Sequence, residues 1–144
     1  MNLTSEKAQQ ATRLVRILRD HGHSAYLVGG CVRDLLLGRE PADYDVATSA
    51  APEEVMRLFP KTYAVGAQFG VVLVPIFRDR GDGIRDNYAI EVATYRSDGA
   101  YSDGRHPDRV QYSPEARLDV QRRDFTINGL LLDPITIEVL DYVG

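Results

Sequence analysis

The sequence predicts a mixed α/β fold, in which helices flank a sheet that is not doubly wound. Along the 144 residues, segments with helical spacing of apolar residues are interspersed with short apolar runs, but without regular βαβ alternation. The length matches one domain, since domains commonly contain about 100–150 residues. We therefore expect residues 1–144 to form a single domain, with a mixed sheet of about five strands and flanking helices.

The first half of the chain is expected to alternate helices and strands. Apolar residues at helical spacing predict an amphipathic first helix, and Gly29-Gly30 separates the first strand from a second helix that ends at Gly38. A third helix carries a proline in its first turn, and Thr48 or Ser49 is expected to cap it. The expected helices cover residues 5–20, 30–37 and 52–58, and the expected strands cover 25–28 and 44–47.

The second half begins with two apolar strands and ends with mixed structure. Between them lies a turn cluster, and after them a stretch without apolar periodicity is expected to be an extended loop. Asp133-Pro134 is expected to turn the chain into its last strand. The expected strands cover residues 71–77, 88–94 and 136–140, the loop 95–109, and helical segments start near 113 and cover 126–132.

Composition limits the class of protein. The formal net charge is −4, whereas modules that grip nucleic acid alone are usually basic. Phosphate binding is therefore expected to be local: either nucleic acid is held by a part outside this sequence, or its affinity is low. The single cysteine excludes an internal disulfide and fits a cytoplasmic location. No apolar run approaches the roughly 20 residues of a membrane span, and the first residues do not resemble a signal peptide.

Paired carboxylates suggest a metal site. Asp43 and Asp45 are expected to point the same way from a strand, with Tyr44 and Val46 on the other face. Two carboxylates this close repel each other unless a cation lies between them, and Mg²⁺ is often held by one or two carboxylates plus substrate phosphates. Glu91, in the strand 88–94, is the candidate third carboxylate. The alternatives are a solvated turn for the aspartates and an edge-strand residue facing water for the glutamate.

A glycine turn suggests a phosphate site. Gly29 and Gly30 let the backbone approach a ligand closely, at the start of a helix whose free N–H groups favour anions. Arg33 adds a bidentate donor for phosphate oxygens. The pattern is neither a dinucleotide fingerprint nor a P-loop, and the alternative is a plain strand-to-helix turn. Cys31, inside the turn, is expected to be a small packed residue rather than a reactive thiol.

A third cluster, Arg122-Arg123-Asp124 with Asn128, combines basic and polar groups suited to a triphosphate and a ribose; the alternative is an exposed helical charge run. In order and spacing, the three pieces resemble the head domain of the class II CCA-adding enzymes (tRNA nucleotidyltransferases) and bacterial poly(A) polymerases. These enzymes belong to the polymerase-β-like nucleotidyltransferases. The segments that carry the resemblance are Gly29-Gly30-Cys31-Val32-Arg33-Asp34, Asp43-Tyr44-Asp45 and Arg122 to Leu130.

The resemblance implies a polymerase-β-like head that adds AMP or CMP from ATP or CTP to an RNA 3′ end, with tRNA as the expected RNA, and releases pyrophosphate. It implies two Mg²⁺ ions held by Asp43 and Asp45, with Glu91 assisting. The residues it assigns to the nucleotide are Gly29, Gly30, Arg33 and Arg123 for the triphosphate, and Asp124 and Asn128 for the sugar.

The resemblance extends to residues 95–107, which are similar to the mobile loop that positions nucleotide for AMP addition. An intact loop indicates A-adding capacity, leaving CCA addition, A-only addition and poly(A) synthesis open. The neck, body and tail that grip tRNA in the family are expected to be absent. His106, His21 and His23 are interpreted as surface residues. Two alternatives remain: nucleotide transfer to a protein or small molecule, and a nucleotide-binding head that is inactive without its missing domains.

Overall fold

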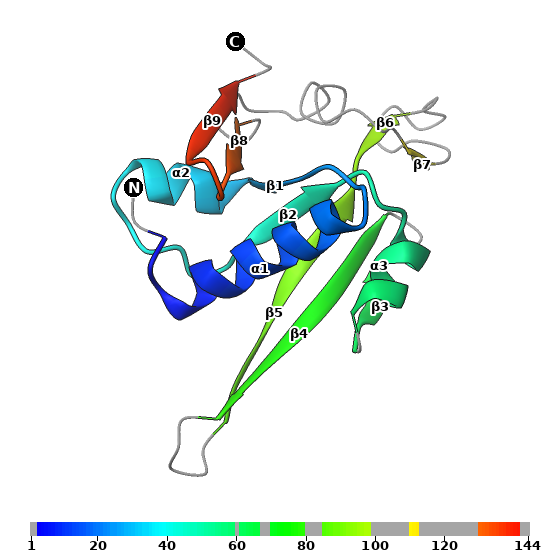
Figure 1. Ribbon diagram of the computed structural model, residues 1–144, viewed down its shortest axis with the longest axis horizontal. Coiled ribbons are helices and arrows are strands. Elements are labelled where there is room, and N and C mark those ends of the chain that lie inside the picture. Colours follow the sequence, from blue (N-terminus) through cyan, green and yellow to red (C-terminus); the bar gives the residue numbers. More distant parts are fainter. Residues whose placement is uncertain are drawn as a thin grey trace, which may run out of the picture.

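The computed structural model describes residues 3–59, 61–66, 70–79, 85–98, 110–112 and 130–141. These residues form a mixed sheet of seven strands in the order β3-β4-β5-β2-β1-β8-β9 and a separate two-stranded sheet, β6-β7 (Figure 1). The helices are α1 (Glu6–Asp20), α2 (Gly30–Leu36) and α3 (Pro52–Leu58). The strands are β1 (Ala25–Val28), β2 (Asp45–Thr48), β3 (Tyr63–Gly66), β4 (Val71–Asp79), β5 (Arg85–Thr94), β6 (Arg96–Asp98), β7 (Val110–Tyr112), β8 (Leu130–Asp133) and β9 (Glu138–Asp141).

Strand β2 lies in the middle of the large sheet, parallel to β5 and antiparallel to β1. The other pairings in this sheet are antiparallel, so the sheet is mixed, as the sequence predicts. In the part of the chain that the structure describes, no helix is long and apolar enough to cross a membrane.

One face of the sheet packs against the helices. Helix α1 buries Leu14 and Leu18 completely, as its amphipathic pattern predicts, and they join a core that includes Leu27 and Val46 from the sheet. Side chains alternate across a strand, so the intervening residues face the other side. There a second, smaller cluster contains Val28, Ala47, Tyr95 and Leu131. The helix-covered face thus carries the main core, while the opposite face carries a smaller apolar cluster as well as the exposed Glu91.

The helix starts differ in how they are capped. Ser5 caps α1, its side chain accepting a hydrogen bond from the Ala8 N–H at 3.1 Å. The expected cap of α3 by Thr48 or Ser49 is wrong, because Ala51 is the cap residue and makes no side-chain bond. The Thr48 hydroxyl instead accepts from the Ala50 N–H at 3.1 Å and donates to the Ser24 carbonyl at 2.7 Å, so it joins two loops.

The predicted helix over residues 126–132 is wrong at its end, because Leu130–Asp133 form strand β8 beside β1. Leu131 and Leu132 are both fully buried but belong to the two clusters on opposite faces. A strand buried on both faces is a continuous apolar run, which periodicity cannot distinguish from a helix. Strand β3 was also not predicted, so the sheet has seven strands rather than about five.

The turn of the last hairpin is longer than expected. Strand β9 begins at Glu138, not at residue 136, because Asp133 organises the turn before it. The carboxylate of Asp133 accepts hydrogen bonds from the N–H groups of Ile135 and Thr136, at 3.0 and 3.2 Å. Ile137 closes the turn with a positive φ of 61°.

The extended loop predicted over residues 95–109 is wrong where the structure describes it. Tyr95 is fully buried, and its hydroxyl lies 2.6 Å from the Ser24 hydroxyl oxygen. Arg96–Asp98 then form β6, which pairs with β7. Residues 99–109, the helix expected from residue 113 and residues 126–129 lie outside the described part of the chain.

Candidate functional site

The two aspartates lie where the chain enters the central strand β2. Asp45 is the first residue of β2, while Asp43 lies in the bend before it and is exposed. The strand that was predicted over residues 44–47 therefore starts at Asp45, one residue later than predicted. Strand alternation thus does not determine the direction of the Asp43 side chain. Both residues nevertheless line one hollow of about 310 Å³, together with Tyr44, Leu73, Ala89 and Glu91.

The pairing of β2 with β5 brings Glu91 to the same place. In this parallel pair Asp45 is the register partner of Glu91, and Leu73 of β4 is the partner of Glu91 on its other side. Strand β5 lies between β2 and β4, so the edge-strand interpretation of Glu91 is wrong. The glutamate is exposed, on the face opposite the helix-covered core. Three carboxylates from two neighbouring strands and one bend thus surround a single opening.

The donor set fits Mg²⁺ in part. Among the described residues, no group of three His, Cys, Asp or Glu side chains is close enough to form a metal cage of its own. Mg²⁺ does not require such a cage, since it is usually held by one or two carboxylates with water and substrate phosphates. Asp43 and Asp45 supply oxygen ligands of the required kind, and Glu91 lies in reach of the same hollow. The residues therefore fit a metal whose remaining ligands come from a phosphorylated substrate.

The glycine turn lies directly against Asp45. Gly29 has φ 82° and ψ −148°, a backbone conformation that is essentially restricted to glycine. A Cβ atom on Gly29 would lie 3.4 Å from Oδ2 of Asp45. On Gly30, a Cβ atom would lie 3.3 Å from Nη2 of Arg33, so this guanidinium folds back over the start of α2. The turn thus combines a close approach of the Gly29 backbone to Asp45, a helix start and the Arg33 guanidinium, whose Nε lies 3.4 Å from Oδ1 of Asp34.

Buried residues hold the turn and the aspartates in place. Cys31 is 2% exposed, and its thiol donates to the Val28 carbonyl at 3.2 Å. This burial confirms the predicted packed residue, and it raises the pKa of the Cys31 thiol to about 11. Tyr44 and Val46 are buried in the helix-covered core, as predicted from the sequence, although Tyr44 precedes the strand. Burial raises the pKa of Tyr44 to about 12, and a hydrogen bond with Ser5 offsets part of that rise.

The remaining predicted residues divide into two groups. His21 is exposed, as expected, whereas His23 is partly buried, with Nε2 3.6 Å from Oε1 of Glu54 in α3. Arg122, Arg123, Asp124, Asn128 and His106 lie outside the described part of the chain, so their roles remain predictions.

The structure adds residues that the sequence did not single out. Leu73 and Ala89 line the hollow because β4 and β5 pair beside it, and no local pattern predicts that register. Lys7, on α1, contacts the carbonyl of Ala42, directly before Asp43. Only the tertiary fold reveals this contact, since 35 residues separate the two partners.

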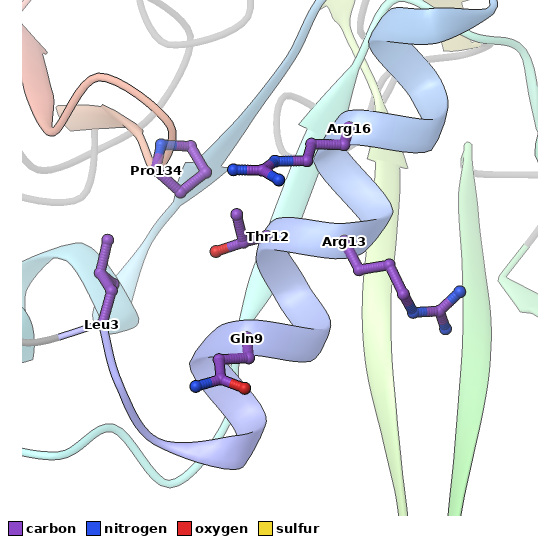
Figure 2. Close-up of a pocket in the computed structure, with 6 residues that line it drawn as sticks. All are labelled: Leu3, Gln9, Thr12, Arg13, Arg16 and Pro134. Atoms are coloured by element: carbon purple, nitrogen blue, oxygen red, sulfur yellow. The ribbon is translucent and has the colours of Figure 1, made fainter.

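A second hollow of similar volume, about 310 Å³, lies along α1 and has a different chemistry. Figure 2 shows Arg16 pointing toward Pro134 and Arg13 pointing the other way. The other lining residues are Leu3, Gln9 and Thr12, so this hollow has two arginines and no carboxylate. It does not suit a cation, and the hollow at Asp43 and Asp45 is the better candidate site.

A glycine turn set against an aspartate that opens a central strand of a mixed sheet, with a second aspartate in the bend before it, is the arrangement of a polymerase-β-like nucleotidyltransferase head. The chain belongs to the poly A polymerase head domain family, whose model matches residues 25–144.

Relatives of the chain are consistent with this family. It is 48% identical over 125 residues to the CCA-adding enzyme of Geobacillus kaustophilus (strain HTA426), covering 87% of this chain and 29% of the relative. The crystal structure of Bacillus stearothermophilus CCA-adding enzyme in complex with CTP is similar, with TM-score 0.76 and 38% identity, over 96% of this chain and 30% of that one. A tRNA nucleotidyltransferase complexed with a primer tRNA and an incoming ATP analog has TM-score 0.62 and 27% identity, over 91% of this chain and 34% of the other. The chain thus spans about a third or less of these relatives' length.

Proposed function

We propose that the chain is the head of an RNA nucleotidyltransferase that adds AMP, CMP or both to an RNA 3′ end. The observation that carries the proposal is the hollow at β2, which Asp43, Asp45 and Glu91 line and where the Gly29 turn abuts Asp45. It is supported by relatives named CCA-adding enzyme and by neighbours whose complexes contain CTP, or a primer tRNA with an ATP analog. We therefore propose ATP and CTP as nucleotides and tRNA as the RNA.

The reaction is a nucleotidyl transfer. The RNA 3′-hydroxyl oxygen forms a bond with the α-phosphorus of the nucleotide, the bond from that phosphorus to the bridging oxygen breaks, and pyrophosphate leaves while the hydroxyl proton passes to solvent. Most of the catalysis in such transfers is positioning and charge neutralisation. Two Mg²⁺ ions, when bound, would supply Lewis-acid activation of the attacking hydroxyl and stabilisation of the leaving group.

The chain's own residues divide this work. Asp43 and Asp45 would hold the metal, with Glu91 beside them in the hollow. The backbone N–H groups at the Gly29 turn and the guanidinium of Arg33 would bind the triphosphate, because the turn abuts Asp45 and the guanidinium folds back over Gly30 at the start of α2.

Three further residues complete the proposed nucleotide site from the family resemblance. Arg123 would hold phosphate, while Asp124 and Asn128 would line the ribose; all three follow from the sequence motif alone. Their roles can be tested independently of the carboxylates, since loss of Arg123 would weaken triphosphate binding without removing a metal ligand.

The proposal expects weak RNA binding by this chain alone. Its net charge of −4 supplies no general attraction for a polyanion, and it spans only 29% of the first relative. We propose that neck, body and tail segments supply the tRNA grip and the choice between CCA addition, A-only addition and poly(A) synthesis. The cytoplasm remains the predicted location, because the one cysteine has no second cysteine in the sequence with which to form a disulfide.

Extension of labelled RNA tests the proposal. The chain is incubated with Mg²⁺, each nucleotide separately, and either a tRNA ending in CC or an unstructured RNA. Asp43→Asn with Asp45→Asn is compared with Asp20→Asn, which removes a carboxylate from the exposed end of α1. We expect addition by the wild type and Asp20→Asn and none by the double variant.

The other outcomes separate the alternatives. Addition that survives the double substitution would refute the carboxylate assignment. Metal-dependent nucleotide binding without addition would identify a head that needs further domains. Transfer to a protein or small molecule, but not to RNA, would show that the acceptor is wrong.

A further inference from the structure

We propose that Lys7 is a positioning residue for Asp43, acting through the backbone of the loop that carries this aspartate. The inference rests on the proposed function, in which Asp43 is a metal ligand. Nζ of Lys7 donates a hydrogen bond of 2.8 Å to the carbonyl oxygen of Ala42, the residue directly before Asp43. The first turn of α1, on the helix-covered side of the sheet, is thus tied to the rim of the hollow.

The loop that carries Asp43 needs this contact because few hydrogen bonds of its own hold it in place. Residues 40–43 lie between α2 and β2, and they make no backbone-to-backbone hydrogen bond with any other described residue. Pro41 and Tyr44 are buried and fix the two sides of the loop, whereas Ala42 and Asp43 are exposed between them. The Lys7 ammonium therefore reaches the part of the loop that the buried anchors leave unsupported.

The lysine is itself held in position. Its Nζ lies 5.2 Å from the centroid of the Tyr88 ring, within cation–π range. Tyr88 packs against the main core from β5, three residues before Glu91. The contacts of Lys7 therefore link α1 to β5 and to the Asp43 loop, and both of these contribute residues to the hollow.

The position of the lysine argues against a role in helix stability alone. Lys7 is the second residue of α1, where a cation is unfavourable because the N-terminal end of the helix dipole is positive. The positive charge of Lys7 does not stabilise the helix at this place, whereas its ammonium group satisfies the carbonyl oxygen of Ala42. A hydrogen bond to a carbonyl fixes the peptide plane between Ala42 and Asp43, and with it the direction from which the carboxylate side chain departs.

The test measures Mn²⁺ affinity in the presence of CTP, by electron paramagnetic resonance of the free ion. Lys7→Met keeps the aliphatic stem and removes the donor, and Lys7→Arg restores a donor. Arg13→Met is the matched control, because it removes one charge from the same helix, where Arg13 donates a hydrogen bond to Gln10 of that helix. The melting temperature of each metal-free variant is recorded alongside.

We expect Lys7→Met to weaken Mn²⁺ binding by about three- to tenfold, at or below the lower end of the range of about 10–100-fold for groups that orient ligands directly. Lys7→Arg should recover most of the affinity, and Arg13→Met should match the wild type. A Lys7→Met chain that binds Mn²⁺ as tightly as Arg13→Met would overturn the inference. So would a loss of affinity that Lys7→Arg does not restore.

Asp43→Asn separates this inference from the proposed function. If Asp43→Asn weakens Mn²⁺ binding but Lys7→Met does not, only the positioning role fails. If Asp43→Asn leaves Mn²⁺ affinity unchanged, the metal-ligand assignment fails and the positioning role fails with it.

Discussion

Replacing Gly29 with alanine tests how closely the phosphate turn and the carboxylates depend on each other. The residue has φ 82° and ψ −148°, and a side chain held in this region costs about 1–3 kcal/mol. The new Cβ atom would lie 3.4 Å from Oδ2 of Asp45, which is an ordinary contact distance. Backbone strain therefore dominates, and relief of that strain would move the turn away from Asp45.

Gly29→Ala should lower the free energy of unfolding by about 1–3 kcal/mol, measured by urea denaturation. For a chain of this size, the melting temperature should fall by roughly 3–10 °C. Metal-dependent CTP binding should weaken as well, because the displaced N–H groups no longer face the phosphates.

Gly22→Ala is the matched control. Gly22 also has a positive φ, of 87°, but a Cβ atom on this residue would have no other atom within 4 Å, and it is far along the chain from the carboxylates. This variant should lose stability without losing CTP affinity. A Gly29→Ala chain whose unfolding free energy stays within about 0.5 kcal/mol of the wild type, the range of neutral surface changes, would refute the strain argument.

Three further predictions concern the scaffold. Arg19→Met removes two 3.1 Å hydrogen bonds to Asp133 and two to the Ala25 carbonyl, and should cost about 2 kcal/mol at neutral pH in urea denaturation. Burial raises the pKa of Asp133, but the bonds from Arg19 and two backbone N–H groups outweigh it and lower the pKa, so the Asp133 part of this stabilisation is present above the unfolded-state pKa and should vanish as the pH falls through the folded-state value. Ile137→Gly should raise the unfolding free energy by about 1 kcal/mol, because a β-branched residue with φ 61° is strained and is 48% exposed; an unchanged or lower denaturation midpoint would contradict this. Burial raises the pKa of Cys31 from 9.0 to about 11, so the stabilisation from the buried neutral thiol should be complete below pH 9 and lost as the pH rises through about 11. A disulfide reagent at pH 8 should therefore label the native chain far more slowly than the chain in urea.

Local signals in the sequence predicted much of the fold. The spacing of Leu14 and Leu18 predicted α1 and its buried face, and Gly29 marked the boundary between β1 and α2. The same signals failed at β8, where Leu131 and Leu132 are buried on opposite faces, because burial on both sides removes the alternation that identifies a strand. Strand β3 depends on pairing with β4, which no local pattern indicates.

In the candidate site too, local motifs could be predicted from the sequence and contacts between distant elements could not. The motif around Asp43 and Asp45 was visible in the sequence, and the structure places both at one hollow. The place of Glu91 depended on the parallel register between β2 and β5, which the family resemblance suggested but spacing alone could not. The contact of Lys7 with Ala42 spans 35 residues and follows from how α1 packs on the sheet, so it could not be predicted from the sequence.

Calorimetric titration of the chain with CTP, in Mg²⁺ and in EDTA, tests the central claim most directly. We predict that CTP binding requires Mg²⁺ and is abolished by Asp45→Asn, because the carboxylate beside the Gly29 turn would hold the Mg²⁺ ion. CTP affinity that is equal in Mg²⁺ and EDTA, or unchanged by Asp45→Asn, would contradict it.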